Sequence, residues 1–217
     1  GRLRLIGRVM ENVRRKVGAD FPVCIRIDAE EFIRDGYTVE DSKLIALRLA
    51  QLGFGYISLS VGGKFEDAIH EPGEVPYPYT GYSGDRAMPG NWYPPMVHAH
   101  LAQEIRSFVR AKGYQVPIAV AGKISDPEDA ESIIASGKAD IVAIARGLLA
   151  DPYWPKKVRA GQRDRIVQCD YCNYCKDLDG THKEVVCYLW PKGARQAPAY
   201  KPDGTLPQWG ADGGGLG

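Results

Sequence analysis

Four of the five cysteines gather towards the C-terminal end of the sequence, where their spacing points to metal chemistry. They form the pattern C-x2-C-x2-C-x11-C and are Cys169, Cys172, Cys175 and Cys187. Two-residue spacings turn successive thiolates inward on one small loop, as iron–sulfur clusters require, and a distant fourth cysteine closes the cage. Four thiolates also suit a structural zinc ion, although zinc sites more often use two separated C-x2-C pairs. We therefore expect an iron–sulfur cluster, with structural zinc as the alternative.

Two short turns that carry a cation have the composition of a phosphate site. Gly122-Lys123 follows one expected strand, and Ala145-Arg146 follows the next. In barrels, backbone N–H groups after the last two strands converge on a phosphate with the N-terminus of a following helix, and a cation completes the charge balance. Small residues at Ala121, Gly122 and Ala145 let the backbone approach closely. One such turn alone would be an ordinary turn with a surface cation, but the pair favours phosphate binding.

Arg26 is a third candidate, because it interrupts an apolar strand. Its guanidinium cannot lose its proton, so it needs an anionic or carbonyl-rich partner. The pyrimidine edge of a flavin, which gathers negative charge on reduction, would be such a partner. The alternative is a salt bridge to Asp28 or Glu30.

The composition limits the class of protein. The 217 residues include 28 Lys+Arg against 27 Asp+Glu, a net charge of +1, and 44% are hydrophobic. This balance argues against nucleic-acid binding through a basic field and is typical of a globular domain. No apolar run approaches the ~18 residues of a membrane span, and the opening GRLRLIGRVMENVRRK is too charged for a signal peptide. We expect a soluble, cytoplasmic protein that binds neither nucleic acid nor membrane.

The elements that must position these residues alternate between helix and strand up to about residue 160. Strands are expected at 21–27, 56–61, 117–121 and 139–145, and helices at 3–16, 38–52, 97–112, 125–137 and, broken by prolines, 148–159. Thr38 with Asp41 and Ser125 with Glu128 resemble capping boxes. Strands separated by helices imply parallel pairing.

Residue periodicity predicts the faces of these elements and thereby the fold class. Leu5, Val9 and Val13 form an apolar stripe on the first helix. In the second strand Ile57 and Leu59 alternate with serines, whereas a doubly wound sheet would be apolar on both faces. Polar groups on one strand face fit the lumen of a (β/α)8 TIM-type barrel. Four strands predict the second half of such a barrel.

We therefore expect three regions along the chain. Residues 1–160 form the C-terminal half of the barrel, 161–190 bind the metal, and 191–217, rich in glycine and proline, form an extended or disordered tail. A long loop at 62–95 carries several aromatic residues that either roof a flat substrate or pack the loop onto the barrel: Tyr77, Tyr79, Tyr82, Trp92 and Tyr93.

Together these segments resemble the old yellow enzyme family of FMN-dependent oxidoreductases. The resemblance runs from about Arg2 to Cys187 and is carried by GADFPVCIRIDAEEF, YISLSVGG, PIAVAGKISDPEDAESIIASGKADIVAIARGLLADP and the cysteine run. It is strongest with the iron–sulfur branch that includes 2,4-dienoyl-CoA reductase and trimethylamine dehydrogenase. The family usually has Arg at the position of Lys123 and Gly at that of Ala145.

The resemblance implies the cofactors and partners. Arg26 would contact the flavin ring, Gly122-Lys123 and Ala145-Arg146 would hold the FMN phosphate, and the four cysteines would ligate a 4Fe–4S cluster next to the flavin. NAD(P)H or another donor would supply electrons, and a small-molecule substrate would be reduced at a double bond or oxidised as an amine. The family's first four strands have no counterpart here, so we expect a second chain or copy to complete the barrel. The rival hypothesis is a non-catalytic, metal-stabilised half-barrel that binds a partner chain.

Overall fold

The computed structural model describes residues 3–62, 84–199 and 205, and they fall into two compact units. The first unit comprises Gly1–Ala87, His98–Ala121 and Ile133–Val142, and the second comprises Met88–Val97, Gly122–Ser132 and Ala143–Gly217, within the described ranges. Three aromatic residues of the expected loop lie outside the described residues: Tyr77, Tyr79 and Tyr82.

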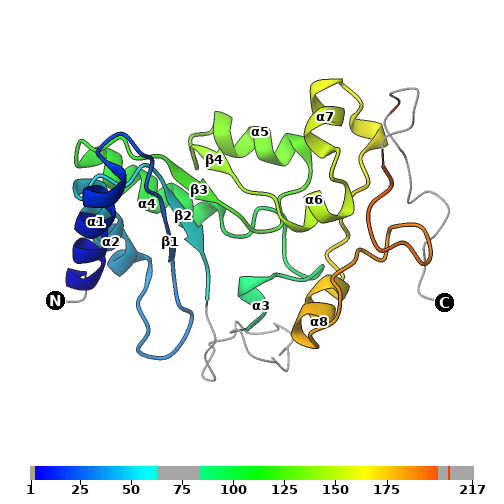
Figure 1. The fold of residues 1–217 in the computed structure, drawn as a ribbon, viewed down its shortest axis with the longest axis horizontal. Coiled ribbons are helices and arrows are strands. Elements are labelled where there is room, and N and C mark those ends of the chain that lie inside the picture. Colours follow the sequence, from blue (N-terminus) through cyan, green and yellow to red (C-terminus); the bar gives the residue numbers. More distant parts are fainter. Residues whose placement is uncertain (1–2, 63–83, 200–204, 206–217) are drawn as a thin grey trace. The chain divides into compact units, whose positions relative to one another are not determined.

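The first unit contains a parallel sheet of four strands in the order β1-β2-β3-β4 (Figure 1). The strands are β1 (Ile25–Asp28), β2 (Ile57–Ser60), β3 (Ile118–Val120) and β4 (Ile141–Val142). Each lies inside or overlaps its expected range but is shorter, because the ladder ends before the apolar run does. Spatial order that follows chain order is the arrangement of successive β/α units. The register pairs Arg26 with Ser58.

The first unit contains helices besides the sheet. They are α1 (Arg4–Val17), α2 (Val39–Gln51), α3 (Gly84–Ala87) and α4 (Ala99–Ala111), while α5 (Pro127–Ala135) runs from the second unit into the first. Helix α2 packs against α4, and α4 packs against β3. Fully buried side chains here include Leu49, Ile57, Ile105 and Ile118. No helix among the described residues is long and apolar enough to cross a membrane.

Local signals fixed helix α2 correctly, but the buried face of α1 differs from the expected one. The Thr38 backbone N–H donates to Asp41 Oδ2 at 3.0 Å, as the capping box predicts. In α1, however, Leu5 is 73% exposed and Val9 44% exposed, while Met10 is buried. The expected stripe was therefore wrong, because the helix turns the face that carries Met10 towards the unit.

The expected capping box at Ser125 is also wrong. Helix α5 begins at Pro127, and Asp126 Oδ1 accepts the Glu128 backbone N–H at 2.8 Å. Proline favours the first helical position, so the capping role moves to the residue before it. The Ser125 hydroxyl instead accepts a hydrogen bond from the Tyr171 hydroxyl at 2.7 Å, within the second unit.

The second unit is held together by a buried ion pair. Its helices are α6 (Arg146–Ala150), α7 (Trp154–Arg159), the 3-10 turn η1 (Arg163–Arg165) and α8 (Tyr174–Gly180), with the break at Pro152 as expected. Lys157 Nζ lies 2.6 Å from Asp151 Oδ2, and both side chains are completely buried. Asp151 also accepts the backbone N–H groups of Tyr153 and Val167, each at 3.0 Å. The Asp151 carboxylate therefore connects the end of α6 to α7 and to the segment that precedes Cys169.

The cysteine segment continues into a small apolar core. Trp190 is buried with Ala150 and Val167, and its Nε1 donates to the Leu149 carbonyl at 3.0 Å. Residues up to Ala197 pack against this cluster. Most of the expected tail, residues 200–204 and 206–217, lies outside the described residues.

Candidate functional site

Lys123, the first of the expected phosphate residues, is a buried cation in the second unit. Lys123 follows strand β3 in the sequence, and it is only 7% exposed. Nζ donates to the carbonyl of Asn91 at 3.0 Å and to that of Tyr93. The Lys123 carbonyl in turn accepts the Met96 N–H at 3.1 Å. Neutral oxygens of the segment 88–97 thus hold the ammonium.

Arg146, the second expected cation, is the first residue of α6 and lies in the same unit. Its Nη1 donates to the Pro89 carbonyl at 2.8 Å and to Asn173 Oδ1 at 2.6 Å. Within the described part of the chain, neither Arg146 nor Lys123 pairs with a carboxylate. Each cation is therefore held by neutral acceptors, and neither is neutralised.

Tyr171, which was not among the residues expected from the sequence, contacts both cations. The Tyr171 ring centroid lies 4.9 Å from Lys123 Nζ and 4.8 Å from Arg146 Cζ. The negative face of an aromatic ring attracts cations at such distances. Tyr171 stands between Cys169 and Cys172, where an aromatic residue in a metal-ligand loop carries no recognisable signal of its own.

Keeping both Lys123 and Arg146 charged at this site costs free energy. Burial lowers the pKa of Lys123, and repulsion by Arg146 lowers it further. Burial likewise lowers the pKa of Arg146, while Cys169 and Cys175 act in the opposite direction. Desolvation disfavours charged forms, and like charges disfavour one another. An anion placed between these groups would relieve both effects.

The small residues expected around this site have separate roles. Gly122 adopts a φ of 129°, which favours glycine. Ala145 precedes α6, and its carbonyl accepts the Leu149 N–H at 2.9 Å. Ala121 lies in the first unit, where its carbonyl is 3.1 Å from His98 Nδ1. At Gly147, which sequence reasoning missed as a constraint, a Cβ would meet Ile144 Cγ2 at 2.8 Å and Ser125 Cβ at 2.9 Å.

Arg26 belongs to the first unit, whereas Lys123 and Arg146 belong to the second. Its residue is exposed on β1, and Nη1 donates to Ser58 Oγ at 3.0 Å, the register partner on β2. Among the described residues Arg26 forms no salt bridge, so the alternative pairing with Asp28 or Glu30 is absent. The guanidinium therefore keeps donors for a further partner.

The four cysteines of the predicted metal site are free thiols in the second unit. Burial raises the pKa of Cys169 to about 11 and that of Cys172 to about 11, and it also raises the pKa of Cys175 and Cys187. Cys175 and Cys187 each raise the pKa of Cys169 further. The thiols are thus near enough to influence one another.

The donor chemistry of this set fits a thiolate-bound metal centre. Cys169 Sγ already accepts the Tyr171 backbone N–H at 3.4 Å, a contact that suits a thiolate ligand. Over residues 3–62, 84–199 and 205, however, no three His, Cys, Asp or Glu side chains converge closely enough to hold a metal ion. The ligand types are those of an iron–sulfur or zinc site, while the described conformation keeps them apart.

Comparison with known proteins relates the chain to flavin enzymes. Residues 92–165 match the family described as NADH:flavin oxidoreductase / NADH oxidase. The chain is 36% identical over 172 residues to NADH oxidase of Thermoanaerobacter brockii, covering 79% of this chain and 23% of that protein. It is 33% identical over 186 residues to N,N-dimethylglycine/sarcosine dehydrogenase of Chromohalobacter salexigens, covering 86% and 24%. The chain therefore spans about a quarter of the length of these curated relatives.

Solved structures show the same architecture. The complex of 2-naphthoyl-CoA reductase with 2-naphthoyl-CoA superposes with a TM-score of 0.70 at 26% identity, covering 88% of this chain and 26% of that chain. Histamine dehydrogenase from Rhizobium sp. 4-9 gives a TM-score of 0.71 at 21% identity, covering 88% and 24%. The described fold is therefore part of a TIM-type barrel of the old yellow enzyme kind, and the expected fold class is confirmed.

Proposed function

We propose that this chain is part of an FMN- and iron–sulfur-dependent oxidoreductase, because residues 92–165 match the NADH:flavin oxidoreductase / NADH oxidase family. In this proposal residues 1–160 are the C-terminal half of the FMN-binding barrel, 161–190 hold a 4Fe–4S cluster, and 191–217 are an extension. The enzyme reduces an unsaturated small molecule or oxidises an amine. Reduced nicotinamide or another donor exchanges electrons with it.

The observation that carries this proposal is the pair of cations on Tyr171. Lys123 and Arg146 lie 4.9 and 4.8 Å from one ring centroid, and the described contacts give them only neutral hydrogen-bond acceptors. A buried cation beside a half-buried one is best stabilised by a dianion, and a phosphate monoester is one. This supports assignment of the phosphate end of FMN to Lys123 and Arg146.

The remaining residues have roles in holding and orienting the cofactors. Gly122 and Ala145 supply backbone close to the phosphate, and Arg26 supplies guanidinium donors for the pyrimidine edge of the flavin. FMN transfers hydrides and electrons when bound, and an iron–sulfur cluster carries single electrons. Cys169, Cys172, Cys175 and Cys187 would ligate the cluster. Structural zinc at the same thiols remains the alternative, because it uses the same ligand chemistry.

We further propose that a second chain or copy completes the barrel. Strands β1 and β4 each pair with only one neighbour among the described residues, so each presents a free edge. Large apolar side chains are exposed on α1 and on the segment between α1 and β1, including Leu5 at 73% and Phe21 at 56%. The same observations support the second candidate function, a metal-stabilised half-barrel that binds a partner without catalysis. The five free cysteines support a cytoplasmic location, where thiols stay reduced.

A titration with two ligands tests the phosphate assignment. FMN and riboflavin share the ring and differ in the phosphate, so flavin fluorescence should show tighter binding of FMN to the unmodified chain. Arg146→Ala should remove most of that difference, because a charge-assisted hydrogen bond contributes about 1.5 to 3 kcal/mol. Equal binding of both ligands to the unmodified chain would overturn the flavin assignment. Iron, zinc and flavin analysis of anaerobically purified protein distinguishes the enzyme from the metal-stabilised half-barrel.

A further inference from the structure

Two residues located between the cysteines contact the cations of the phosphate site rather than one another. Tyr171 lies between Cys169 and Cys172, and Asn173 lies between Cys172 and Cys175. We propose that Asn173 and Tyr171 are positioning residues for Arg146 and Lys123, so that closure of the cysteine loop around a metal sets the affinity of the two cations for a phosphate monoester. This inference rests on the proposed function.

Asn173 bridges the cysteine loop and the anion site through hydrogen bonds. It is only 4% exposed and both ends of its amide are used. Oδ1 accepts from Arg146 Nη1 at 2.6 Å, and Nδ2 donates to the Met88 carbonyl at 2.9 Å. The neighbouring Pro89 carbonyl accepts from the same Nη1. One amide thereby fixes the guanidinium relative to both the cysteine loop and the segment 88–97.

The way in which Arg146 is held leaves it able to bind an anion. Its described hydrogen bonds use Nη1 alone, so Nε and Nη2 keep their N–H groups. A guanidinium binds phosphate through two parallel N–H groups in a fixed fork. A neutral amide orients this fork without cancelling its charge, whereas a carboxylate in the same place would neutralise it.

Tyr171 supplies the second contact from the loop. Its ring lies against both cations, and its hydroxyl donates to Ser125 Oγ, which locates the ring on the segment that follows Lys123. The ring reduces the cost of two neighbouring positive charges through its negative face. Its backbone N–H donates to Cys169 Sγ at 3.4 Å, so a change in the position of that sulfur reaches the ring directly.

Chain connectivity couples the positions of Tyr171 and Asn173 to that of Cys172. Tyr171 and Asn173 are each bonded directly to a proposed ligand, Cys172, on either side. Convergence of the sulfur atoms on a metal must therefore move or fix both side chains. We expect metal binding and phosphate binding to favour each other, as linkage requires of two coupled sites.

The test compares FMN with riboflavin on the full chain, anaerobically reconstituted with iron and sulfide. Asn173→Gly suits the test because Asn173 has a φ of 63°, which glycine adopts without strain. It should lower the ratio of FMN to riboflavin affinity about tenfold while the iron content stays unchanged. Asn173→Asp, which tolerates the same backbone and adds a carboxylate beside Arg146, should lower the ratio further.

A matched pair at Tyr171 separates the ring from the hydroxyl. Tyr171→Phe keeps the ring and should retain most of the preference for FMN, whereas Tyr171→Leu should lose it. Removal of the metal from the unmodified chain should also reduce the ratio. If both Asn173 variants keep the unmodified ratio, the positioning role is wrong while the phosphate site stands. If the unmodified chain does not distinguish FMN from riboflavin, the phosphate site itself is wrong.

Discussion

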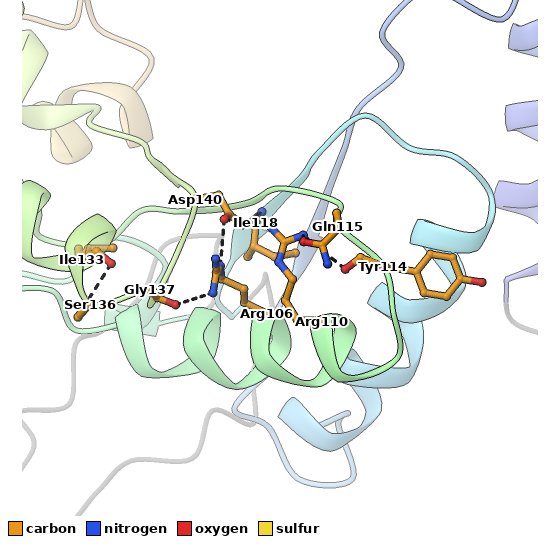
Figure 2. A network of polar contacts seen from close by, with 9 residues as sticks. All are labelled: Arg106, Arg110, Tyr114, Gln115, Ile118, Ile133, Ser136, Gly137 and Asp140. Atoms are coloured by element: carbon orange, nitrogen blue, oxygen red, sulfur yellow. Dashed lines mark hydrogen bonds and ion pairs between the residues drawn. The ribbon is translucent and has the colours of Figure 1, made fainter.

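Arg106 on helix α4 donates from Nε to Asp140 Oδ1 at 3.0 Å, directly before strand β4 (Figure 2). Arg110, one turn further along α4, contacts both oxygens of the same carboxylate at 3.1 Å. The carboxylate also accepts the Ile118 backbone N–H at 2.9 Å, at the start of β3. One side chain thus connects a helix to two strands of the sheet.

We predict that Asp140 contributes stability that depends on acidity. Burial alone would raise the pKa of Asp140, but the Ile118 N–H and the two arginines hold it below its usual value. A lowered pKa in the folded state gives stability that is complete above the unfolded pKa and is lost as the pH falls through the folded one. Asp140→Asn should cost about 2 kcal/mol at neutral pH and less at about pH 3.

Urea unfolding at both pH values measures this dependence. Asp126→Asn is the matched control, because Asp126 pairs with Arg163 at 2.8 Å on the surface and asparagine still caps α5. Its cost should stay below about 1 kcal/mol. A difference between Asp140→Asn and the unmodified chain that grows towards acid pH would contradict the assigned role.

The buried pair of Lys157 and Asp151 gives a second prediction. Lys157→Met should destabilise the second unit by about 3 to 5 kcal/mol, because it leaves the Asp151 carboxylate buried without its cation. Lys192→Met removes the same charge from an exposed position of the second unit and should change the free energy of unfolding by less than about 0.5 kcal/mol. Similar denaturation midpoints for the two variants would show that Lys157 is dispensable.

The metal ligands are tested through absorption. Cys172→Ser should abolish the broad visible absorption of an anaerobically reconstituted cluster, because cysteine thiolates are the ligands that hold such clusters. Cys24→Ser changes a half-buried free thiol of the first unit and should leave the spectrum intact. Stoichiometric zinc without iron after reconstitution would instead identify a structural zinc site.

Association of the chain is tested by sedimentation at micromolar concentration. In the described part of the chain β1 and β4 each have one strand neighbour, and α1 has an exposed apolar face, so we expect a dimer or a complex with a second chain. Leu5→Glu places a charge on that face and should reduce self-association without unfolding the chain. Leu44→Glu, on an exposed position of α2, is the control that should not. A stable monomer of the unmodified chain, alone and when mixed with a chain that carries the first half of the barrel, would refute the expected association.

Local chemistry made much of the fold predictable. Thr38 and Asp41 specified the start of α2, and the alternation at Ile57 and Leu59 specified a strand with one buried face. These signals depend on residues within one turn or one pleat of each other. The start of α5 was missed because Pro127 overrides a motif that places Ser125 first, and the buried face of α1 was missed because Met10 packs where Leu5 does not.

The candidate site was predictable in its charges but not in its geometry. Lys123 and Arg146 stand in turns after strands, so their types and order indicated an anion site. Their contacts with Tyr171 and Asn173 join residues far apart in the sequence, 27 positions in the case of Arg146 and Asn173. No local pattern encodes such a contact, which is decided by how the cysteine loop packs.

The anchoring of Trp190 has a consequence for any shortened version of the protein. A chain cut after Cys187 would keep all four thiols but would expose Ala150 and Val167 to water and deprive the Leu149 carbonyl of its indole donor. A chain that continues through Ala197 would retain this cover. The smallest stable cysteine module therefore extends about ten residues past its last sulfur, since burial of that apolar cluster depends on side chains that bind no metal.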